Sequence, residues 1–255
     1  MKITHRQFLK FSELVYRECG INLHDGKQQL LQARLAKRLR NTGTDSIEQY
    51  LKLIEINGQE LLNFLNAIST NHTYFFRESH HFDCLGPEHT NIWCSASSSG
   101  EEPYSIAIHC LEKNFRPTIL ATDISTNVLQ MGERGVYPVE KAKAVSSQIL
   151  RRYFQKGHGK MEGYIRVKGE LRRMVTFSRF NLLNDSPPSQ TFDIVFCRNV
   201  LMYFDNHVKT KVIDMLHGAL KWGGYLIIGG AESLNNIEHN YKYIKPSIYR
   251  KVAGT

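Results

Sequence analysis

The sequence predicts an α/β domain that follows a smaller all-α domain. The first 70 residues contain short amphipathic segments separated by capping and breaking residues, such as the helix expected from Thr4 to about Glu18. From Asn91 onward, apolar runs typical of buried strands alternate with longer segments of helical periodicity. This alternation predicts a mainly parallel sheet with helices on both faces, preceded by a small helical bundle.

Three more helices are expected in the N-terminal region. They run from about Gly26 to Asn41 after Asp25, over SIEQYLKLIEI after Asp45 and Ser46, and over QELLNFLNAIS to near Thr70. In the first of these three, Leu31, Leu35 and Leu39 form an apolar stripe. The residues of a neighbouring basic stripe are Lys27, Arg34, Lys37 and Arg38. Such a stripe is either a solvated face or a docking surface for an acidic helix.

The α/β region is expected to contain four main strands, namely NIWCSA, TILATDI, FDIVFCRN and GYLIIGG. Helices are expected over EEPYSIAIHCLEKN, from Thr126 to about Gly135, and over HVKTKVIDMLHGALKW. Between Phe154 and Phe180 the strand-like runs YIRV and MVTFSRF predict a small antiparallel excursion. Near the end, YKYIK and SIYRKV predict an antiparallel hairpin at the edge of the sheet.

Composition narrows the class of protein. The 255 residues are 42% hydrophobic and 22% charged, as in an ordinary globular protein. No apolar run reaches the roughly 18 residues of a membrane span, and the N-terminus lacks a signal-peptide pattern. The five cysteines are scattered without a CxxC pair, which favours a reducing cytoplasm and no metal site. The net charge of +9 favours an acidic partner.

A ligand site is expected where the strands of the sheet end, because open α/β sheets bind ligands there. The first strand is followed by SSSGEE, a small glycine-containing turn that opens a helix without the GxGxxG pattern of dinucleotide sites. Glu101 and Glu102 in this turn would repel a pyrophosphate and attract a cationic ligand. They therefore favour S-adenosylmethionine over NAD, although either carboxylate could instead simply stabilise the helix N-terminus.

Polar residues follow the other strands as well. Asp123 is either a turn or cap residue or an acceptor for the ribose hydroxyls of a nucleoside, and its place after the SSSGEE loop favours ribose binding. Asn181-Leu182 could hold an adenine through amide groups. Asn199 and Val200 follow FDIVF, where Asn199 is either a strand cap or a ligand contact. Arg198, beside them, is expected to form a structural ion pair.

The segment NHTYFFRE belongs to neither the bundle nor the sheet. Phe75 and Phe76 are expected to anchor it and to present Arg77 at a fixed place. The alternative for Arg77 is a surface salt bridge with Glu78 or a neighbour.

Together these residues resemble the chemotaxis receptor methyltransferases, the CheR family. The similar segments, in the expected order over almost the whole chain, are GINLHDGKQQLLQARLAKRL, NHTYFFRESHHF, SSSGEEPYSIAI, ATDI, NLL, CRNVLMYF and GGAES. The chain departs from the family in having Ser97 and Ser99 in the small loop and only DCLGPEHTN between HHF and IWCSA, which is short for the family.

The resemblance implies a fold and an activity. The fold is a helical receptor-docking domain (1–70), a linker with a cofactor-site segment (71–90) and a Rossmann-like S-adenosylmethionine-dependent methyltransferase domain (91–255), with a small antiparallel β-subdomain inserted at about 154–177. The activity is methyl transfer from S-adenosylmethionine to glutamate side chains of chemotaxis receptors in the cytoplasm, giving glutamate 5-O-methyl esters and S-adenosylhomocysteine.

The resemblance also implies roles for individual residues. The cofactor contacts are Asn71, Thr73, Arg77, Glu102, Asp123, Asn181, Leu182, Asn199 and Val200. Arg77 and Tyr203 would lie beside the reacting methyl group and the substrate carboxylate. The basic stripe of Lys27, Arg34, Lys37 and Arg38 would dock the receptor, and the inserted β-subdomain binds a receptor's C-terminal tether peptide in some members of the family.

Three other functions fit the sequence less well. A nucleic-acid methyltransferase would suit the basic charge, but CRNVLMYF contains no proline where amino methylases of bases carry NPPY-like or DPPF-like segments. A dehydrogenase is disfavoured by SSSGEE. A non-catalytic module that kept the fold and bound the cofactor or the receptor without turnover is the third alternative.

Overall fold

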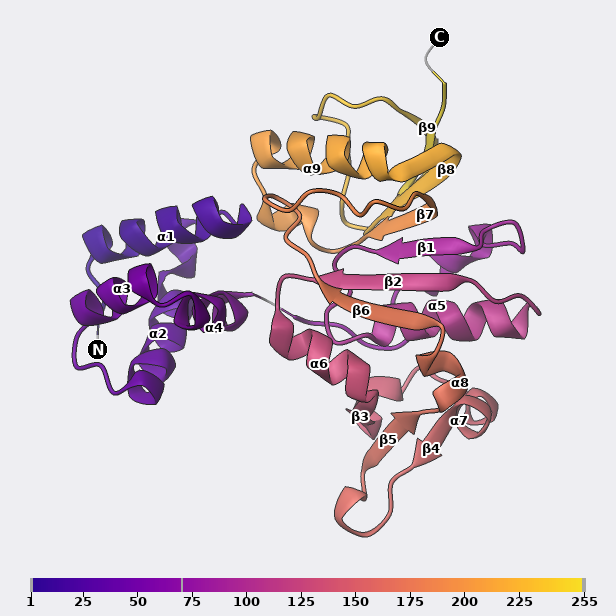
Figure 1. The fold of residues 1–255 in the computed structure, drawn as a ribbon, viewed down its shortest axis with the longest axis horizontal. Helices are drawn as coiled ribbons and strands as arrows, with labels where there is room; N and C mark the ends of the chain where they lie inside the picture. The colour runs from indigo at the N-terminus through magenta and orange to yellow at the C-terminus, as the bar shows by residue number, and fades with distance from the viewer. Residues whose placement is uncertain (1, 70, 254–255) are drawn as a thin grey trace.

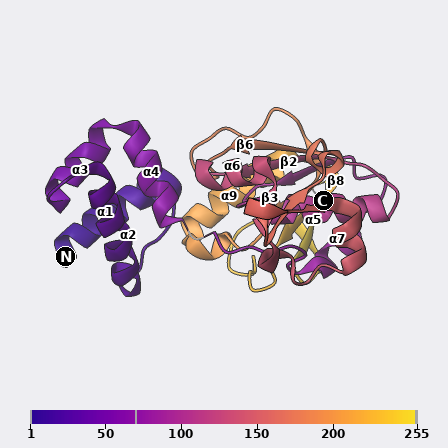
Figure 2. The same ribbon diagram turned by 90° about the horizontal axis from the view of Figure 1, so that it is seen from below.

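The computed structural model describes residues 2–69 and 71–253, which form a helical bundle beside a larger α/β domain (Figure 1). The bundle consists of α1 (His5–Cys19), α2 (Gln28–Thr42), α3 (Ile47–Ile56) and α4 (Gly58–Ile68). Seen from below in Figure 2, the four helices form a separate group beside the α/β domain. Predictions of these four helices are confirmed.

The ends of the helices follow from capping chemistry. Thr4 and Gln7 form a capping box at the start of α1, and Ser46 caps α3 through its side chain. The second helix begins later than expected, because Asp25–Lys27 forms a 3₁₀ turn and α2 starts at Gln28. Lys27 therefore precedes the regular helix.

The main sheet has seven strands in the order β6-β2-β1-β7-β8-β10-β9. The strands are β1 (Asn91–Cys94), β2 (Thr118–Asp123), β6 (Val175–Arg179), β7 (Phe192–Cys197), β8 (Leu220–Ile228), β9 (Tyr241–Lys245) and β10 (Ile248–Lys251). The first five pair in parallel, whereas β10 is antiparallel to both β8 and β9. This arrangement confirms the predicted parallel sheet and the C-terminal hairpin at its edge.

Helices cover both faces of the sheet. Successive side chains of a strand point to opposite faces, so each face presents apolar side chains that need a covering layer. Ile194 and Phe196 of β7 face a core that contains α5 (Glu101–Glu112). Val195 and Cys197 face a second core built on α9 (Asn206–Ala219). A further helix, α6 (Thr126–Arg134), follows β2.

The inserted small sheet has three antiparallel strands in the order β3-β5-β4. They are β3 (Val136–Pro138), β4 (Phe154–Lys156) and β5 (Tyr164–Val167), accompanied by α7 (Ser147–Tyr153) and α8 (Gly169–Arg172). The expected bounds of about 154–177 need correction at both ends. The small sheet already starts at Val136, and the run MVTFSRF supplies β6, which pairs in parallel with β2 in the main sheet.

The end of α1 packs against the α/β domain beside the expected site. The Asn181 side chain donates to the carbonyl of Glu18 at 2.6 Å, and the backbone N–H of Asn22 donates to the carbonyl of Tyr203 at 2.8 Å. The Tyr16 hydroxyl donates to Asp205, which caps α9, at 2.8 Å. The helical domain therefore fixes the turn that carries Tyr203.

Within the described ranges, none of the helices is both long and apolar enough to span a bilayer.

Candidate active site

A pocket opens where the parallel strands of the main sheet end, and its empty space is about 770 Å³ including the open mouth. The predicted residues that line it are Asn71, Thr73, Arg77, Glu102, Asp123, Asn199, Val200 and Tyr203. They come from the linker, α5, the end of β2 and the turn after β7, so the structure brings together segments that are distant in the sequence.

A second, more apolar pocket continues from the first, since Ile21, Asp123 and Val200 line both. Its wall includes the remaining two predicted cofactor residues, Asn181 and Leu182. Ile21 follows α1, so the helical domain forms part of this wall. A flat apolar group such as an adenine ring suits a hollow of this kind.

Asp123 ends β2 between the two pockets. One carboxylate oxygen accepts the backbone N–H of Ser98 and the other accepts the N–H of Ser125, both at 2.9 Å. Burial raises the pKa of Asp123, and these N–H groups oppose that shift. Each oxygen retains lone pairs for a further donor, as the binding of two ribose hydroxyls requires.

The loop before α5 turns tightly at Gly100, which has a left-handed φ of 94°. A Cβ at this position would come within 2.9 Å of the Tyr137 hydroxyl and 3.0 Å of Gly132. Glycine is therefore required both by the backbone conformation and by the close approach of β3 and α6.

The two glutamates that follow Gly100 have different roles. Glu101 is fully buried, where it accepts a hydrogen bond from Ser99 at 2.7 Å and pairs with Lys141 at 3.2 Å. Glu102 instead lines the pocket and pairs with Arg198 at 3.0 Å. Of the two carboxylates that suggested a cationic ligand, only Glu102 faces the site.

Arg77 is presented by a firmly anchored segment, as expected. The Phe75 ring is fully buried and makes edge contacts with the rings of Tyr137 and Phe154. The Arg77 guanidinium donates to the carbonyl of His72 at 2.9 Å, while its Nε lies 3.7 Å from Glu78. The side chain remains 26% exposed, so it is positioned by its neighbours and still accessible from the pocket.

Asn199 occupies a left-handed conformation, with φ of 58°. Its backbone N–H donates to Glu232 at 2.8 Å, and its side-chain amide donates to Glu78 at 3.3 Å. Glu232 also accepts the N–H of Gly229 at 2.7 Å, and a Cβ on Gly229 would lie 2.5 Å from the Asn199 amide nitrogen. The GGAES segment therefore closes around the turn after β7.

Asn181 differs from the expectation that its amide groups read an adenine. Its side-chain nitrogen is bound to the Glu18 carbonyl, its side-chain oxygen accepts the N–H of Leu183, and its own N–H donates to Asp185. The Leu182 N–H has no protein acceptor within the described residues, which leaves it as the backbone donor of this pair. Asn181 thus holds the two domains together at the pocket wall.

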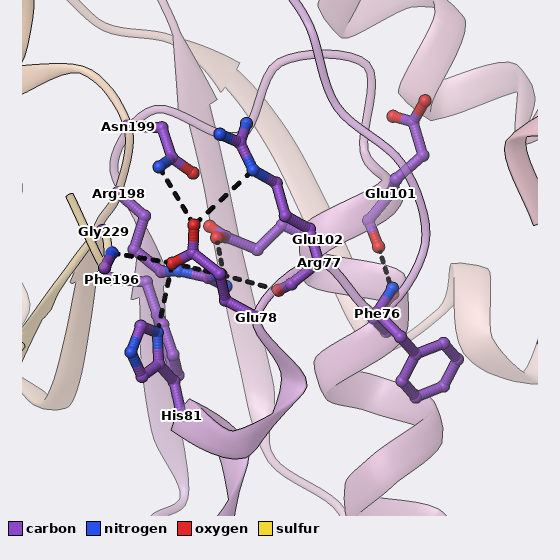
Figure 3. Close-up of polar contacts among 12 residues, drawn as sticks. Phe76, Arg77, Glu78, His81, Glu101, Glu102, Phe196, Arg198, Asn199 and Gly229 are labelled. Carbon is purple, nitrogen blue, oxygen red and sulfur yellow. Dashed lines mark hydrogen bonds and ion pairs between the residues drawn. The ribbon is translucent and has the colours of Figure 1, made fainter. Parts of the chain in front are cut away.

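Two residues that hold pocket-lining residues in place were not predicted to do so, namely Glu78 and Glu232. Figure 3 shows the Glu78 carboxylate between Arg77, Arg198 and Asn199. Arg198 forms the expected structural ion pair, and it does so with two carboxylates, Glu78 and Glu102. The sequence signal for Glu78 was its place beside Arg77, and that for Glu232 was the GGAES segment.

The basic stripe of α2 is only partly available to a partner. Arg34 and Lys37 are exposed, and Lys27 is half-buried before the helix. Arg38 instead turns toward α4, where its guanidinium forms two hydrogen bonds with the buried carboxylate of Glu60. The charge of Arg38 is therefore compensated inside the bundle, which separates it from the other residues of the stripe.

The donor set fits S-adenosylmethionine. Two carboxylates, Asp123 and Glu102, line the pocket, and a more apolar hollow adjoins it. No cluster of three or more metal-ligating side chains occurs in the described part of the chain. The Rossmann-like sheet and this site define a methyltransferase of the S-adenosylmethionine-dependent class.

Comparison with known proteins identifies the family. The profile of the CheR methyltransferase SAM-binding domain matches residues 71–250, and that of the CheR all-alpha domain matches residues 6–69. The chain therefore belongs to the CheR methyltransferase family, and its cofactor is S-adenosylmethionine. The predicted family and fold class are confirmed.

Relatives that align over nearly their whole length agree with this assignment. The chain is 37% identical to a chemotaxis protein methyltransferase of Salmonella typhimurium, over 98% of this chain and 91% of the relative. It is 34% identical to one of Borreliella burgdorferi, over 98% and 96%. The N-methyltransferase NodS from Bradyrhizobium japonicum, solved with S-adenosyl-L-homocysteine, aligns at a TM-score of 0.37 and 16% identity over 62% of this chain and 63% of that chain.

Proposed function

We propose that the protein transfers a methyl group from S-adenosylmethionine to glutamate side chains of chemotaxis receptors, forming glutamate 5-O-methyl esters. One observation carries the proposal: Arg77 and Tyr203 line the same pocket as the cofactor candidates Glu102 and Asp123. A cation and a phenol thus lie beside the place expected for the methyl donor. This arrangement suits a carboxylate as the methyl acceptor.

The cofactor contacts in this proposal are Asn71, Thr73, Arg77, Glu102, Asp123, Asn181, Leu182, Asn199 and Val200. Asp123 binds the ribose hydroxyls, and Glu102 lies near the charged amino-acid end. Leu182 and Val200 form the wall beside the adenine. Asn181 acts here mainly by fixing that wall to α1.

The reaction needs no general base, because a glutamate carboxylate with a pKa of about 4.3 is already ionised at neutral pH. The cofactor, when bound, supplies an electrophilic methyl group on a sulfonium sulfur. Loss of this methyl group would leave the sulfur as a neutral thioether. The protein's task is to hold the carboxylate oxygen in line with that methyl group and to exclude water. Arg77 orients the carboxylate by a charge-assisted hydrogen bond, and Tyr203 orients it from another side.

The receptor docks through the exposed cations of α2, Arg34 and Lys37, with Lys27 nearby. The same proposal places the enzyme in the cytoplasm. A receptor tether peptide is a second contact, for which the small sheet offers two features. The strand β4 is an edge strand, and an apolar hollow beside it is lined by Val139, Leu150, Phe154 and Tyr164.

The test uses membranes that contain a chemotaxis receptor and S-adenosylmethionine labelled in the methyl group. The proposal predicts label in the receptor that mild base releases as methanol, as a carboxyl methyl ester requires. Three other results would contradict the proposal. Label in nucleic acid would favour a base methylase, and base-stable label in protein would favour an N-methylase. Cofactor binding without any transfer would favour a non-catalytic module.

A further inference from the structure

Arg198 lies at the end of β7 and is almost completely buried, with only 2% of its side chain exposed. Burial of a charge is costly unless charged partners and hydrogen bonds compensate it. Its partners are the carboxylate of Glu102 and the carbonyl of Arg77, two residues that line the pocket, and the carboxylate of Glu78, which lies next to Arg77 in the chain. The position of this one guanidinium therefore determines the position of several functional groups.

The first contact is with the cofactor candidate Glu102. Arg198 Nη1 donates to Glu102 Oε2 at 3.0 Å, and the Glu102 side chain is 14% exposed. Burial raises the pKa of Glu102, whereas the charge of Arg198 opposes the shift. The other groups that face this carboxylate are the Cys94 thiol, Glu78 and Arg77.

The second contact is with the backbone of the catalytic candidate Arg77. Arg198 Nη2 donates to the Arg77 carbonyl at 2.6 Å and also lies 3.2 Å from Glu78 Oε2 (Figure 3). It therefore joins the linker to the turn after β7.

The third residue that Arg198 fixes is Asn199, which it reaches through Glu78. Glu78 has a left-handed φ of 50°. Besides Arg198, its carboxylate accepts the N–H of Gly230 at 2.9 Å and the side-chain amide of Asn199 at 3.3 Å. Burial acts to raise the pKa of Glu78, but these donors and Arg198 outweigh it and hold the pKa below its usual value. Glu78 thus stays ionised and fixes both Arg198 and Asn199.

We propose that Arg198 is a positioning residue of the cofactor site, which holds the Glu102 carboxylate by an ion pair while it fixes the Arg77 backbone and, through Glu78, the Asn199 side chain. This inference rests on the proposed role of Glu102 in binding the cofactor. It assigns Arg198 a role beyond the local structural ion pair that the sequence suggested.

The test measures the dissociation constant of S-adenosylhomocysteine by calorimetry at pH 6.5, 7.5 and 8.5. Each variant's constant is divided by the wild-type constant at the same pH, which cancels the titration of the ligand itself. Without the Arg198 charge, burial raises the pKa of Glu102 further, so this carboxylate should take up a proton more readily as the pH falls. For Arg198→Met, the ratio should exceed about ten at pH 6.5 and fall severalfold by pH 8.5, up to roughly tenfold per pH unit for one linked proton.

Two further variants separate this inference from the site assignment. Glu102→Gln should raise the constant by the same factor at every pH, and the double variant Arg198→Met with Glu102→Gln should lose the pH trend. If Glu102→Gln binds S-adenosylhomocysteine as tightly as the wild type does, Glu102 is not a cofactor contact and that assignment fails. If Glu102→Gln binds weakly but the Arg198→Met ratio is near one or flat with pH, the positioning role of Arg198 is overturned.

A matched control comes from the opposite end of the same strands, where Lys221 pairs with Asp193 at 2.7 Å. Lys221→Met removes an ion pair without touching the pocket and should leave the ratio near one at all three pH values. If Arg198→Met does not fold, as judged by its melting curve, Arg198→Gln replaces it with the same predicted pH trend. A flat ratio in that folded variant overturns the proposal equally.

Discussion

Replacing Arg77 with alanine tests the orienting role proposed for its guanidinium. Within the described residues, the side chain donates one hydrogen bond, to the His72 carbonyl at 2.9 Å, lies 3.7 Å from Glu78 in a partly exposed ion pair, and is itself 26% exposed. Its removal should therefore disturb the fold little. A hydrogen bond to a charged group contributes about 1.5–3 kcal/mol. If that interaction holds the substrate carboxylate in the transition state, its loss lowers kcat/KM by roughly 10- to 150-fold.

The assay measures initial rates of methyl transfer to receptor membranes, with cofactor and receptor concentrations varied separately. Arg77→Lys should retain part of the activity, since it keeps the charge but lacks the planar fork of donors. Arg116→Ala serves as the control, because Arg116 pairs with Glu170 on the surface, away from the pocket. A folded Arg77→Ala enzyme with nearly wild-type kcat/KM for the receptor would refute the assigned role.

Three further predictions concern the cofactor site and the stability of the fold. Asp123→Ala should raise the cofactor dissociation constant by at least tenfold in calorimetry, since about 1.5–3 kcal/mol of hydrogen bonding is lost, and unchanged affinity would contradict the ribose contact. Gly20→Ala places a Cβ 2.7 Å from Val208, whereas Gly43→Ala shares the left-handed φ but meets nothing within 4 Å. In urea unfolding, Gly20→Ala should therefore cost about 1–3 kcal/mol more than Gly43→Ala, and equal costs would remove the proposed close domain contact. Burial and the Arg198 charge lower the pKa of His81 to about 4 in the folded protein, whereas its pKa in the unfolded chain is near 6.5. Between about pH 4 and 6.5 the unfolded state therefore binds a proton that the folded state does not. Stability should fall as the pH drops from about 6.5 to 4, by on the order of 3 kcal/mol from this group, and His81→Gln should flatten that slope in denaturant titrations.

The location of the site was predictable because it depends on where the strands of the sheet end, which can be identified from the sequence. Each buried strand of a parallel sheet ends at the same edge, so the polar residues after β2 and β7 had to converge. Asp123 and Asn199 were found in this way, and the structure places both in one pocket. Capping residues such as Thr4 and Ser46 likewise fixed the helix starts, because their partners are three residues away.

The features that the sequence did not reveal depend on distant partners. Glu78 and Arg198 are 120 residues apart, and no local pattern signals their pairing. Arg38 matched the basic stripe by its helical position, but its orientation is decided by the buried carboxylate of Glu60 on another helix. The small sheet was misplaced because β3 has only three residues, too few to show an alternating pattern.

The most direct test of the account is a crystal structure of the protein with S-adenosylhomocysteine. The ribose hydroxyls should lie within hydrogen-bond distance of Asp123, the amino-acid end near Glu102, and the adenine against Leu182 and Val200. The sulfur should then point toward the space between Arg77 and Tyr203. A cofactor bound in this pocket with its sulfur directed away from both residues, or bound elsewhere in the protein, would contradict the central claim that one pocket holds the cofactor beside the reacting carboxylate.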